Sequence, residues 1–383
     1  IANPKTTLAW LTTAVGAPGY VLGMLVPIRE SGSMIPQLFI GGLIRQLAVR
    51  KWVWVLGSIV QGLCIVSLGF VAMRLEGKTA GWAILAIVIA FSLARGFCSI
   101  SAKDVLGKTI PKKVRGQLNG WSASAAGLLT VAIGSVLILP GATLQGSHVI
   151  GWCLIGAGAL WFFAAATYAT VDEAAGETGG GRNVLEALAK LKLLANDKPF
   201  RRFVMTRALL MCSALSAPFY VAMAQSNIGS TISSLGAFVV ASGLASLLSA
   251  PFWGRFADRS SKQVMIAGAL ITALTGIVTF MLEQTLPNAT QTFWLLPSTY
   301  FILSIAHSGV RIGRKTYVVD LATGNQRTDY VAISNTVIGI LLLVVGTVGL
   351  LVPVIGNSGV ILLLATMGLA GAALGTSLPE TET

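Results

Sequence analysis

Long apolar stretches, separated by short polar segments, dominate the pattern along the chain. Eleven of them are complete and are of about the 20 residues that a helix needs to cross a bilayer core of about 30 Å. The sequence therefore predicts a polytopic all-α membrane protein. The expected spans cover residues 15–42, 52–73, 80–102, 117–140, 148–171, 202–225, 231–253, 264–283, 292–312, 329–354 and 357–377, and residues 6–14 form the end of a twelfth whose front is truncated.

Composition agrees with this pattern. Of the 383 residues, 54% are apolar and 11% are charged, and the mean hydropathy is +0.78. Soluble domains carry about 25% charged residues, so this chain has too few to cover a water-facing surface. The lipid bilayer is therefore the expected surrounding. The net charge of +13 would suggest a nucleic-acid partner in a soluble protein, but basic residues also collect in the cytoplasmic loops of membrane proteins. We expect no nucleic-acid partner.

The positions of Lys and Arg predict the orientation. Segments 45–52, 103–115, 171–203, 255–262 and 311–327 hold 21 of the 27 basic residues, whereas the opposite loops hold only Arg74 and Lys78. By the positive-inside rule the first group is cytoplasmic. An even number of spans then places both termini in the cytoplasm, and the compact loops favour a bacterial inner membrane.

Cysteine and histidine usage excludes several chemistries. The chain has four cysteines, Cys64, Cys98, Cys153 and Cys212, and no two of them have the CxxC spacing of a redox or zinc motif. Only His148 and His307 could supply an imidazole base. We therefore expect no metal, no cofactor and no catalytic site, and do not expect an enzyme.

An internal repeat divides the chain. A shift of 212 residues superposes the halves without a gap, for example Ser92 on Ser304, Gly127 on Gly339 and Arg95 on His307. Two parallel six-helix halves are typical of transporters that rock around a central site. The expected units are residues 1–171, a cytoplasmic linker 172–201, and residues 202–383. In the linker, Asn183 to Glu186 resembles a capping box that opens an amphipathic helix.

The eighth-to-ninth connection carries the most specific motif, Gly254-Arg-Phe-Ala-Asp258-Arg259-Ser-Ser-Lys262. It resembles the loop signature Gly-x-Leu-Ala-Asp-Arg-x-Gly-Arg-Arg of the major facilitator superfamily. The first-half counterpart, Gly42 to Lys51, keeps the glycine and the basic pair Arg50-Lys51 but lacks the aspartate.

The resemblance implies twelve helices in two six-helix bundles and alternating access. We also expect a monomer. Asp258 would pair with neighbouring guanidinium groups in one state and release them in the other. Charged residues that recur at the cytoplasmic rim are candidates for the gate, although they also fit a solvated loop face. The gating candidates are Asp258, Arg259, Arg50, Lys51, Lys103, Asp104, Arg115 and Arg327.

Ionisable residues inside the membrane are functional candidates, because burying them there is costly. Four of them would make a basic cavity suited to an anionic solute: Arg95, Arg207, His307 and Arg311. Alternatively, the arginines only extend to the interface. Glu30 is the first proton-carrier candidate and His307 the second. Alternatively, Arg29, which directly precedes Glu30, could hold the Glu30 carboxylate charged in a structural pair.

The leading hypothesis is a secondary transporter for a small anionic solute, coupled to protons. A drug or amphiphile exporter is the second hypothesis, although the proline-centred signature of proton-driven drug antiporters is missing between Ala125 and Thr130. The third is a transporter-like sensor or lipid-handling protein that binds without turnover. The glycines Gly19 and Gly23 predict close helix packing in the second span.

Overall fold

A computed structural model describes residues 3–36, 40, 43–44, 46–109, 112–138, 147–176, 178, 190–229, 231–257, 259–321 and 326–380. Within these ranges, side chains are described except at 103, 107, 112–124, 147, 190, 250, 319, 326–329 and 332. The expected amphipathic helix of the linker falls mostly outside the described residues. Only its end is seen, as η1 (Lys190–Lys192) and α9 (Leu193–Asn196).

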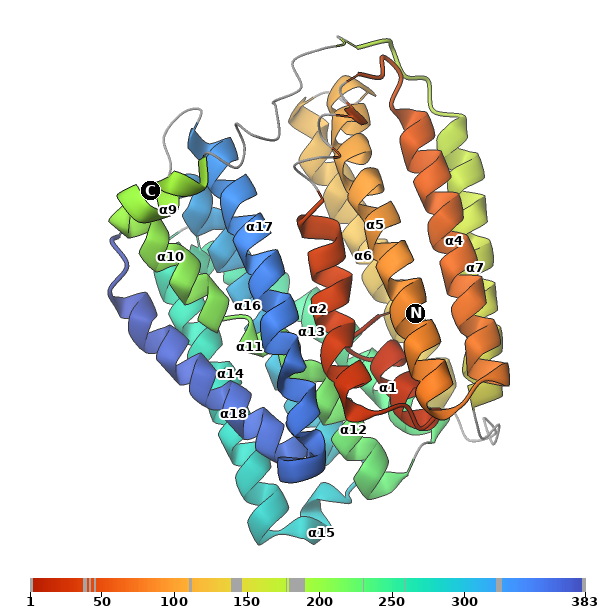
Figure 1. Ribbon diagram of the computed structural model, residues 1–383, viewed down its shortest axis with the longest axis vertical. Coiled ribbons are helices and arrows are strands. Elements are labelled where there is room, and N and C mark those ends of the chain that lie inside the picture. Colours follow the sequence, from red (N-terminus) through yellow and green to blue (C-terminus); the bar gives the residue numbers. More distant parts are fainter. Residues whose placement is uncertain are drawn as a thin grey trace.

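The described chain is helical throughout, as the apolar pattern predicts, because a backbone in lipid must satisfy its hydrogen bonds internally. The first half holds α1 (Thr7–Ala14), α2 (Gly19–Met34), α4 (Lys51–Arg74), α5 (Gly77–Thr109), α6 (Lys112–Ile138) and α7 (Ser147–Ala169). The second half holds α10 (Lys198–Leu209), α11 (Cys212–Leu215), α12 (Ala217–Ile228), α13 (Ile232–Ala257), α14 (Ser261–Thr285), α15 (Pro287–Thr290), α16 (Leu295–Leu321), α17 (Gln326–Gly346), η2 (Thr347–Leu351) and α18 (Val352–Thr376). With α10 to α12 as one broken span, these make the twelve spans of the two-bundle architecture. Figure 1 shows α4 and α7 at one edge and α14 and α18 at the other.

The expected seventh span, 202–225, is broken rather than continuous. It consists of α10, the single turn of α11, and α12. Pro218 stands in the first turn of α12, where its missing N–H costs nothing, but it cannot continue a helix from α11. Asp197 begins α10, because its side chain accepts a hydrogen bond from the N–H of Phe200 at 2.9 Å.

Helices of the two halves pack together in pairs that the repeat relates. α2 packs against α17, and their equivalents α13 and α6 pack against each other. A Cβ on Gly127 would lie 2.8 Å from Leu247, and one on Gly339 would lie 2.8 Å from Ile35. Both members of the second pair lie 212 residues from their counterparts in the first. These contacts confirm the predicted repeat.

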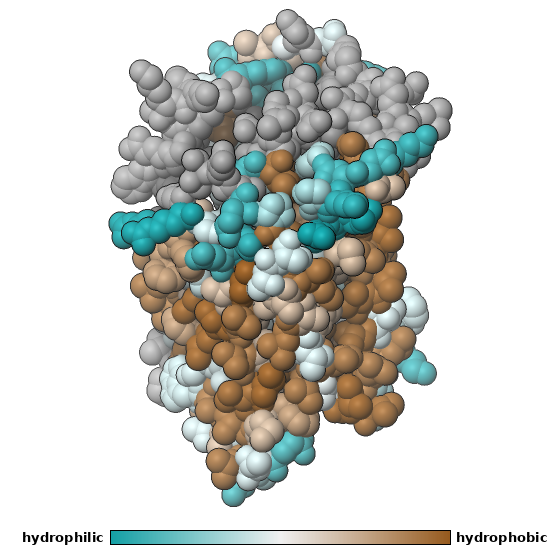
Figure 2. Space-filling model, turned by 90° about the vertical axis from the view of Figure 1, so that its left-hand side faces the viewer, coloured by the Kyte–Doolittle hydropathy of each residue, from teal (hydrophilic) through white to brown (hydrophobic). Residues whose placement is uncertain are grey.

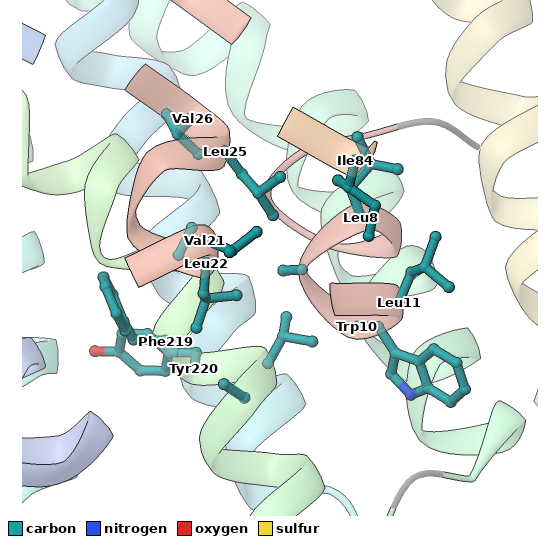
Figure 3. Close-up of a cluster of buried hydrophobic side chains, with 14 of the residues drawn as sticks. Leu8, Trp10, Leu11, Val21, Leu22, Leu25, Val26, Ile84, Phe219 and Tyr220 are labelled. Atoms are coloured by element: carbon teal, nitrogen blue, oxygen red, sulfur yellow. The ribbon is translucent and has the colours of Figure 1, made fainter. Parts of the chain in front are cut away.

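The predicted close packing at Gly19 and Gly23 is also confirmed. A Cβ on Gly23 would lie 2.6 Å from the carbonyl oxygen of Gly346 and 2.7 Å from the Cα of Gly349. α2 and α17 therefore meet backbone to backbone at the end of the molecule away from the basic loops. Side chains of α1, α2 and α12 form a buried apolar cluster beside this contact, including Leu8, Trp10 and Tyr220 (Figure 3).

The surface of the second half has a broad apolar belt, with hydrophilic residues gathered toward the end that carries α9 and α10 (Figure 2). Seven stretches of the described helices have both the length and the hydropathy needed to cross a membrane. The protein is therefore a multi-pass membrane protein.

Candidate functional site

A polar chamber of about 390 Å³ lies inside the first half. It contains three cationic side chains, from Lys5 just before α1, Arg29 on α2 and Arg95 on α5, together with the carboxylate of Glu30. We call it the cationic chamber. Its lining residues are Asn3, Pro4, Lys5, Arg29, Glu30, Ile65, Phe91, Arg95 and Trp161.

A smaller polar chamber of about 140 Å³ lies on the second-half side. Hydroxyl groups dominate its wall, and His307 and Arg311 of α16 supply the ionisable groups. We call it the serine-lined chamber. Its polar lining residues include Ser213, Ser242, Ser246, Tyr300, Ser304 and Ser308. Asn3 and Lys5 line both chambers, so the two form one central site between the halves.

Lys5 joins the chambers through a direct contact. Its Nζ lies 2.6 Å from Nε2 of His307, and Nδ1 of the same ring lies 3.1 Å from Oγ of Ser213. The sequence analysis did not select Lys5, because nothing local to it indicates that a residue 302 positions away will meet it.

The repeat also relates the two chambers. Arg95 and His307 are equivalent positions, and so are Phe91 and Leu303, and Glu30 and Ser242. One member of each pair lines the cationic chamber and the other lines the serine-lined chamber. The chambers are therefore two versions of one site, of which the first half has kept the stronger charges.

Arg29 and Glu30 are adjacent in sequence but separate in their contacts. The guanidinium of Arg29 lies 4.7 Å from the ring centroid of Phe91, a cation–π geometry. Arg29 is 7% exposed, and its Nε and Nη1 atoms have no hydrogen-bond partner. Among the described residues, no ion pair joins Arg29 to Glu30. The carboxylate of Glu30 instead interacts electrostatically with Lys5 and Arg314.

Arg314 is a second residue that the sequence analysis missed. It lies one turn beyond Arg311 on α16 and was assigned to the cytoplasmic loop 311–327. α16 continues to Leu321, nine residues past the expected end of this span at 312, and carries Arg314 within the helix. A helical pattern that continues through residues 313–321 was the signal in the sequence that could have extended this helix and placed Arg314 on it.

Arg207 is placed apart from the other predicted solute ligands. It is 6% exposed, in the last turn of α10, and lines neither polar chamber. Its Nη1 donates to Oγ of Ser334 at 2.7 Å and its Nη2 to Oδ1 of Asn335 at 2.8 Å. Arg207 therefore neither extends to the interface nor faces the solute site. It ties α10 to α17.

The first-half gating candidates form a compact charge cluster. Arg50 pairs with Asp104, and Lys108 lies 3.0 Å from Asp104 and 2.9 Å from Glu173. The Glu173 carboxylate also accepts the backbone N–H groups of Arg50 and Lys51, which begin α4. Burial alone raises the pKa of Glu173, but these hydrogen bonds outweigh burial and hold the pKa below its usual 4.5. Arg50, Asp104 and Lys108 belong to the first half and Glu173 to the start of the linker, so these pairs do not join the two bundles. The gating role of these residues stays a prediction.

The second half has a simpler version of this cluster. Lys262 at the start of α14 lies 3.2 Å from Glu380, which follows α18. Arg259 is exposed just before α14. Asp258 and the side chains of Lys103, Arg115 and Arg327 lie outside the described residues, so their gating role stays a prediction.

Comparison with known proteins identifies the fold. Residues 208–382 match the family model described as Major Facilitator Superfamily. The resemblance to the major facilitator superfamily is confirmed. No curated protein matches the chain in sequence.

Solved major facilitator structures superpose along nearly the whole chain. The crystal structure of a D-xylose–proton symporter gives a TM-score of 0.71 at 14% identity, covering 95% of this chain and 89% of that one. A mutant of the nucleoside transporter NupG gives 0.73 at 14% identity, covering 97% and 94%. The inward open xylose transporter XylE from E. coli gives 0.68 at 14% identity, covering 99% and 92%. At these identities the likeness concerns the fold.

Proposed function

We propose that the protein is a secondary active transporter that moves a small anionic solute across the inner membrane by alternating access, with both termini in the cytoplasm. The observation that carries this proposal is the charge of the central site. Lys5, Arg29 and Arg95 line one chamber and His307 and Arg311 the other, against one carboxylate, Glu30, among the described lining residues.

Guanidinium groups at this site suit an anion. Arginine binds carboxylate, sulfonate or phosphate oxygens through paired N–H donors, and such charge-assisted hydrogen bonds are about twice as strong as neutral ones. The free Nε and Nη1 of buried Arg29 supply unused donors. A buried donor without a partner costs about 1–3 kcal/mol, which an anionic ligand would recover.

Glu30 is the proposed proton carrier. Its carboxylate faces the same chamber as the solute and has attractive cations, Lys5 and Arg314, but no ion pair within 4 Å among the described residues. Movement of the halves would change its distance from those cations, and so change its affinity for a proton. This links proton loading to the conformational cycle.

The test is solute uptake by the full chain in proteoliposomes, with and without an imposed pH gradient. We expect Glu30→Gln to retain solute exchange at equal pH and to lose accumulation driven by the gradient. We expect Arg95→Gln to weaken both, while Arg74→Gln, at the end of α4 and outside the site, changes neither. Unchanged uptake and exchange in Glu30→Gln and in Arg95→Gln would contradict the proposed site.

A further inference from the structure

A third chamber, of about 650 Å³, adjoins the cationic chamber. Its wall is mainly apolar and is built chiefly by α6 and α7, with side chains of α13 such as Leu235 and Val239. A few polar residues also line it: Asn3, Thr6, Thr7, Thr130 and Ser242. α6 packs along α13 of the opposite half while α7 packs along α4, which leaves the space between them. We call this the apolar chamber.

The apolar chamber is open rather than sealed within the packed core. Leu129 of α6 and Leu160 of α7 line it and are 54% and 58% exposed. Both helices belong to the membrane spans of the two-bundle architecture. The chamber therefore offers an accessible apolar wall at the depth of the hydrophobic layer.

Aromatic residues connect this chamber to the charged one. Trp161 and Asn3 line both chambers. The rings of Trp161 and Phe91 are nearly perpendicular, with centroids 6.0 Å apart. The guanidinium carbon of Arg29 lies 4.7 Å from the centroid of the same Phe91 ring. A continuous path thus runs from apolar wall to buried guanidinium.

We propose that the solute is an anionic amphiphile with one hydrocarbon chain, whose acidic group binds Arg29 and Arg95 and whose chain lies in the apolar chamber. This inference rests on the proposed function, because it names the solute class of the same central site. The two volumes, about 650 and 390 Å³, fall within the range of about 300–1,000 Å³ typical of ligand pockets. An apolar wall with a few convergent charges is also the usual composition of such pockets.

The charges favour this class over a neutral drug or a purely hydrophilic anion. A neutral amphiphile would leave the donors of Arg29 unpaired. A short hydrophilic anion would satisfy Arg29 but would leave the apolar chamber to membrane lipid. Only a molecule with both parts matches both linings.

The experiment compares butanesulfonate with decanesulfonate, which stay ionised and so do not cross a bilayer as neutral acids. Binding to the purified full chain in nanodiscs is measured against empty nanodiscs. Ala157→Trp, from the α7 wall, and Ala126→Trp, from the α6 wall, each fill the apolar chamber. Ala159→Trp is the matched control, because Ala159 is exposed on α7 but does not line the chamber.

We expect Ala157→Trp and Ala126→Trp to weaken decanesulfonate binding by about tenfold or more, the equivalent of losing a few buried methylenes. Butanesulfonate binding should be unchanged in both, and Ala159→Trp should change neither ligand. Arg29→Gln and Arg95→Gln should weaken both ligands.

The outcomes separate the two proposals. If both chamber-filling variants fold, by their thermal unfolding, and bind decanesulfonate like the wild type, the apolar chamber is no solute subsite. The proposed function then still stands provided that Arg95→Gln weakens both sulfonates. If neither arginine variant weakens either sulfonate, the anionic site itself is wrong.

Discussion

The Nζ atom of Lys5 lies 2.6 Å from Nε2 of His307, and this contact joins the segment before α1 in one half to α16 in the other. At this separation one nitrogen donates a hydrogen bond and the other accepts it, because two cationic groups so close together would repel each other strongly. Glu30, Arg311 and Arg314 also act on this pair electrostatically. The contact is therefore a direct link between the two halves.

The first prediction follows from this link. His307→Leu keeps a side chain of similar length but removes the ring nitrogens that meet Lys5 and Ser213, so the two halves should be held together less tightly. The measurement is the distance between spin labels on Trp52 and Lys198, exposed residues of opposite halves. The distance distribution should be broader in His307→Leu than in the wild type. An identical distribution in both proteins would show that the contact does not hold the halves together.

The second prediction concerns Glu173, whose side chain is fully buried between Lys108 and the start of α4. Glu173→Gln should lower the free energy of unfolding by about 1.5–3 kcal/mol, the usual contribution of hydrogen bonds to a charged group. Glu380→Gln is the matched control, because Glu380 follows the equivalent helix of the second half but is 63% exposed. An exposed ion pair contributes about 0–1 kcal/mol.

The same comparison has a pH dependence. The folded-state pKa of Glu173 is depressed, so its contribution is complete above the unfolded value of about 4.5 and is lost as the pH falls through the lower folded value. Thermal unfolding should therefore show a constant difference between wild type and Glu173→Gln near neutrality and a shrinking difference below pH 4.5. A difference that grew on acidification would contradict this assignment.

Much of this architecture was predictable because lipid leaves the chain few options. The number of spans, the repeat and the membrane depth of Arg95 and His307 follow from apolar length and from the cost of membrane charge, whereas several span limits differ from those expected. The contacts of an intramembrane arginine do not follow from the sequence. Arg95 and Arg207 both lie in apolar stretches of the sequence. The partners of Arg207, Ser334 and Asn335, are nevertheless more than 100 residues away from it. The contact of Lys5 with His307 is equally non-local, and so is the convergence of Glu173 on α4.

The third prediction tests the tight end of the molecule. Gly23→Ala places a methyl group 2.6 Å from the Gly346 carbonyl oxygen, so α2 and α17 must separate there. Overpacking of this kind costs about 1–3 kcal/mol, and it should lower the unfolding temperature and widen spin-label distances at that end. Gly156→Ala is the control, because nothing lies within 4 Å of a Cβ at that position. Equal effects of the two substitutions would remove the argument from close packing.

The fourth prediction separates an arginine that holds helices together from one that binds solute. Arg207→Lys keeps the positive charge but cannot donate to Ser334 and Asn335 at once, so it should lower the free energy of unfolding by about 1.5–3 kcal/mol. Butanesulfonate binding should be unchanged in the fraction that remains folded. Arg95→Lys should show the reverse, with unaltered thermal unfolding and weaker binding, because Arg95 lines the cationic chamber and has no described hydrogen bond to a helix of its own half. If Arg207→Lys instead lost sulfonate binding at full stability, Arg207 would belong to the solute site after all, and the tie between α10 and α17 would have to open during transport.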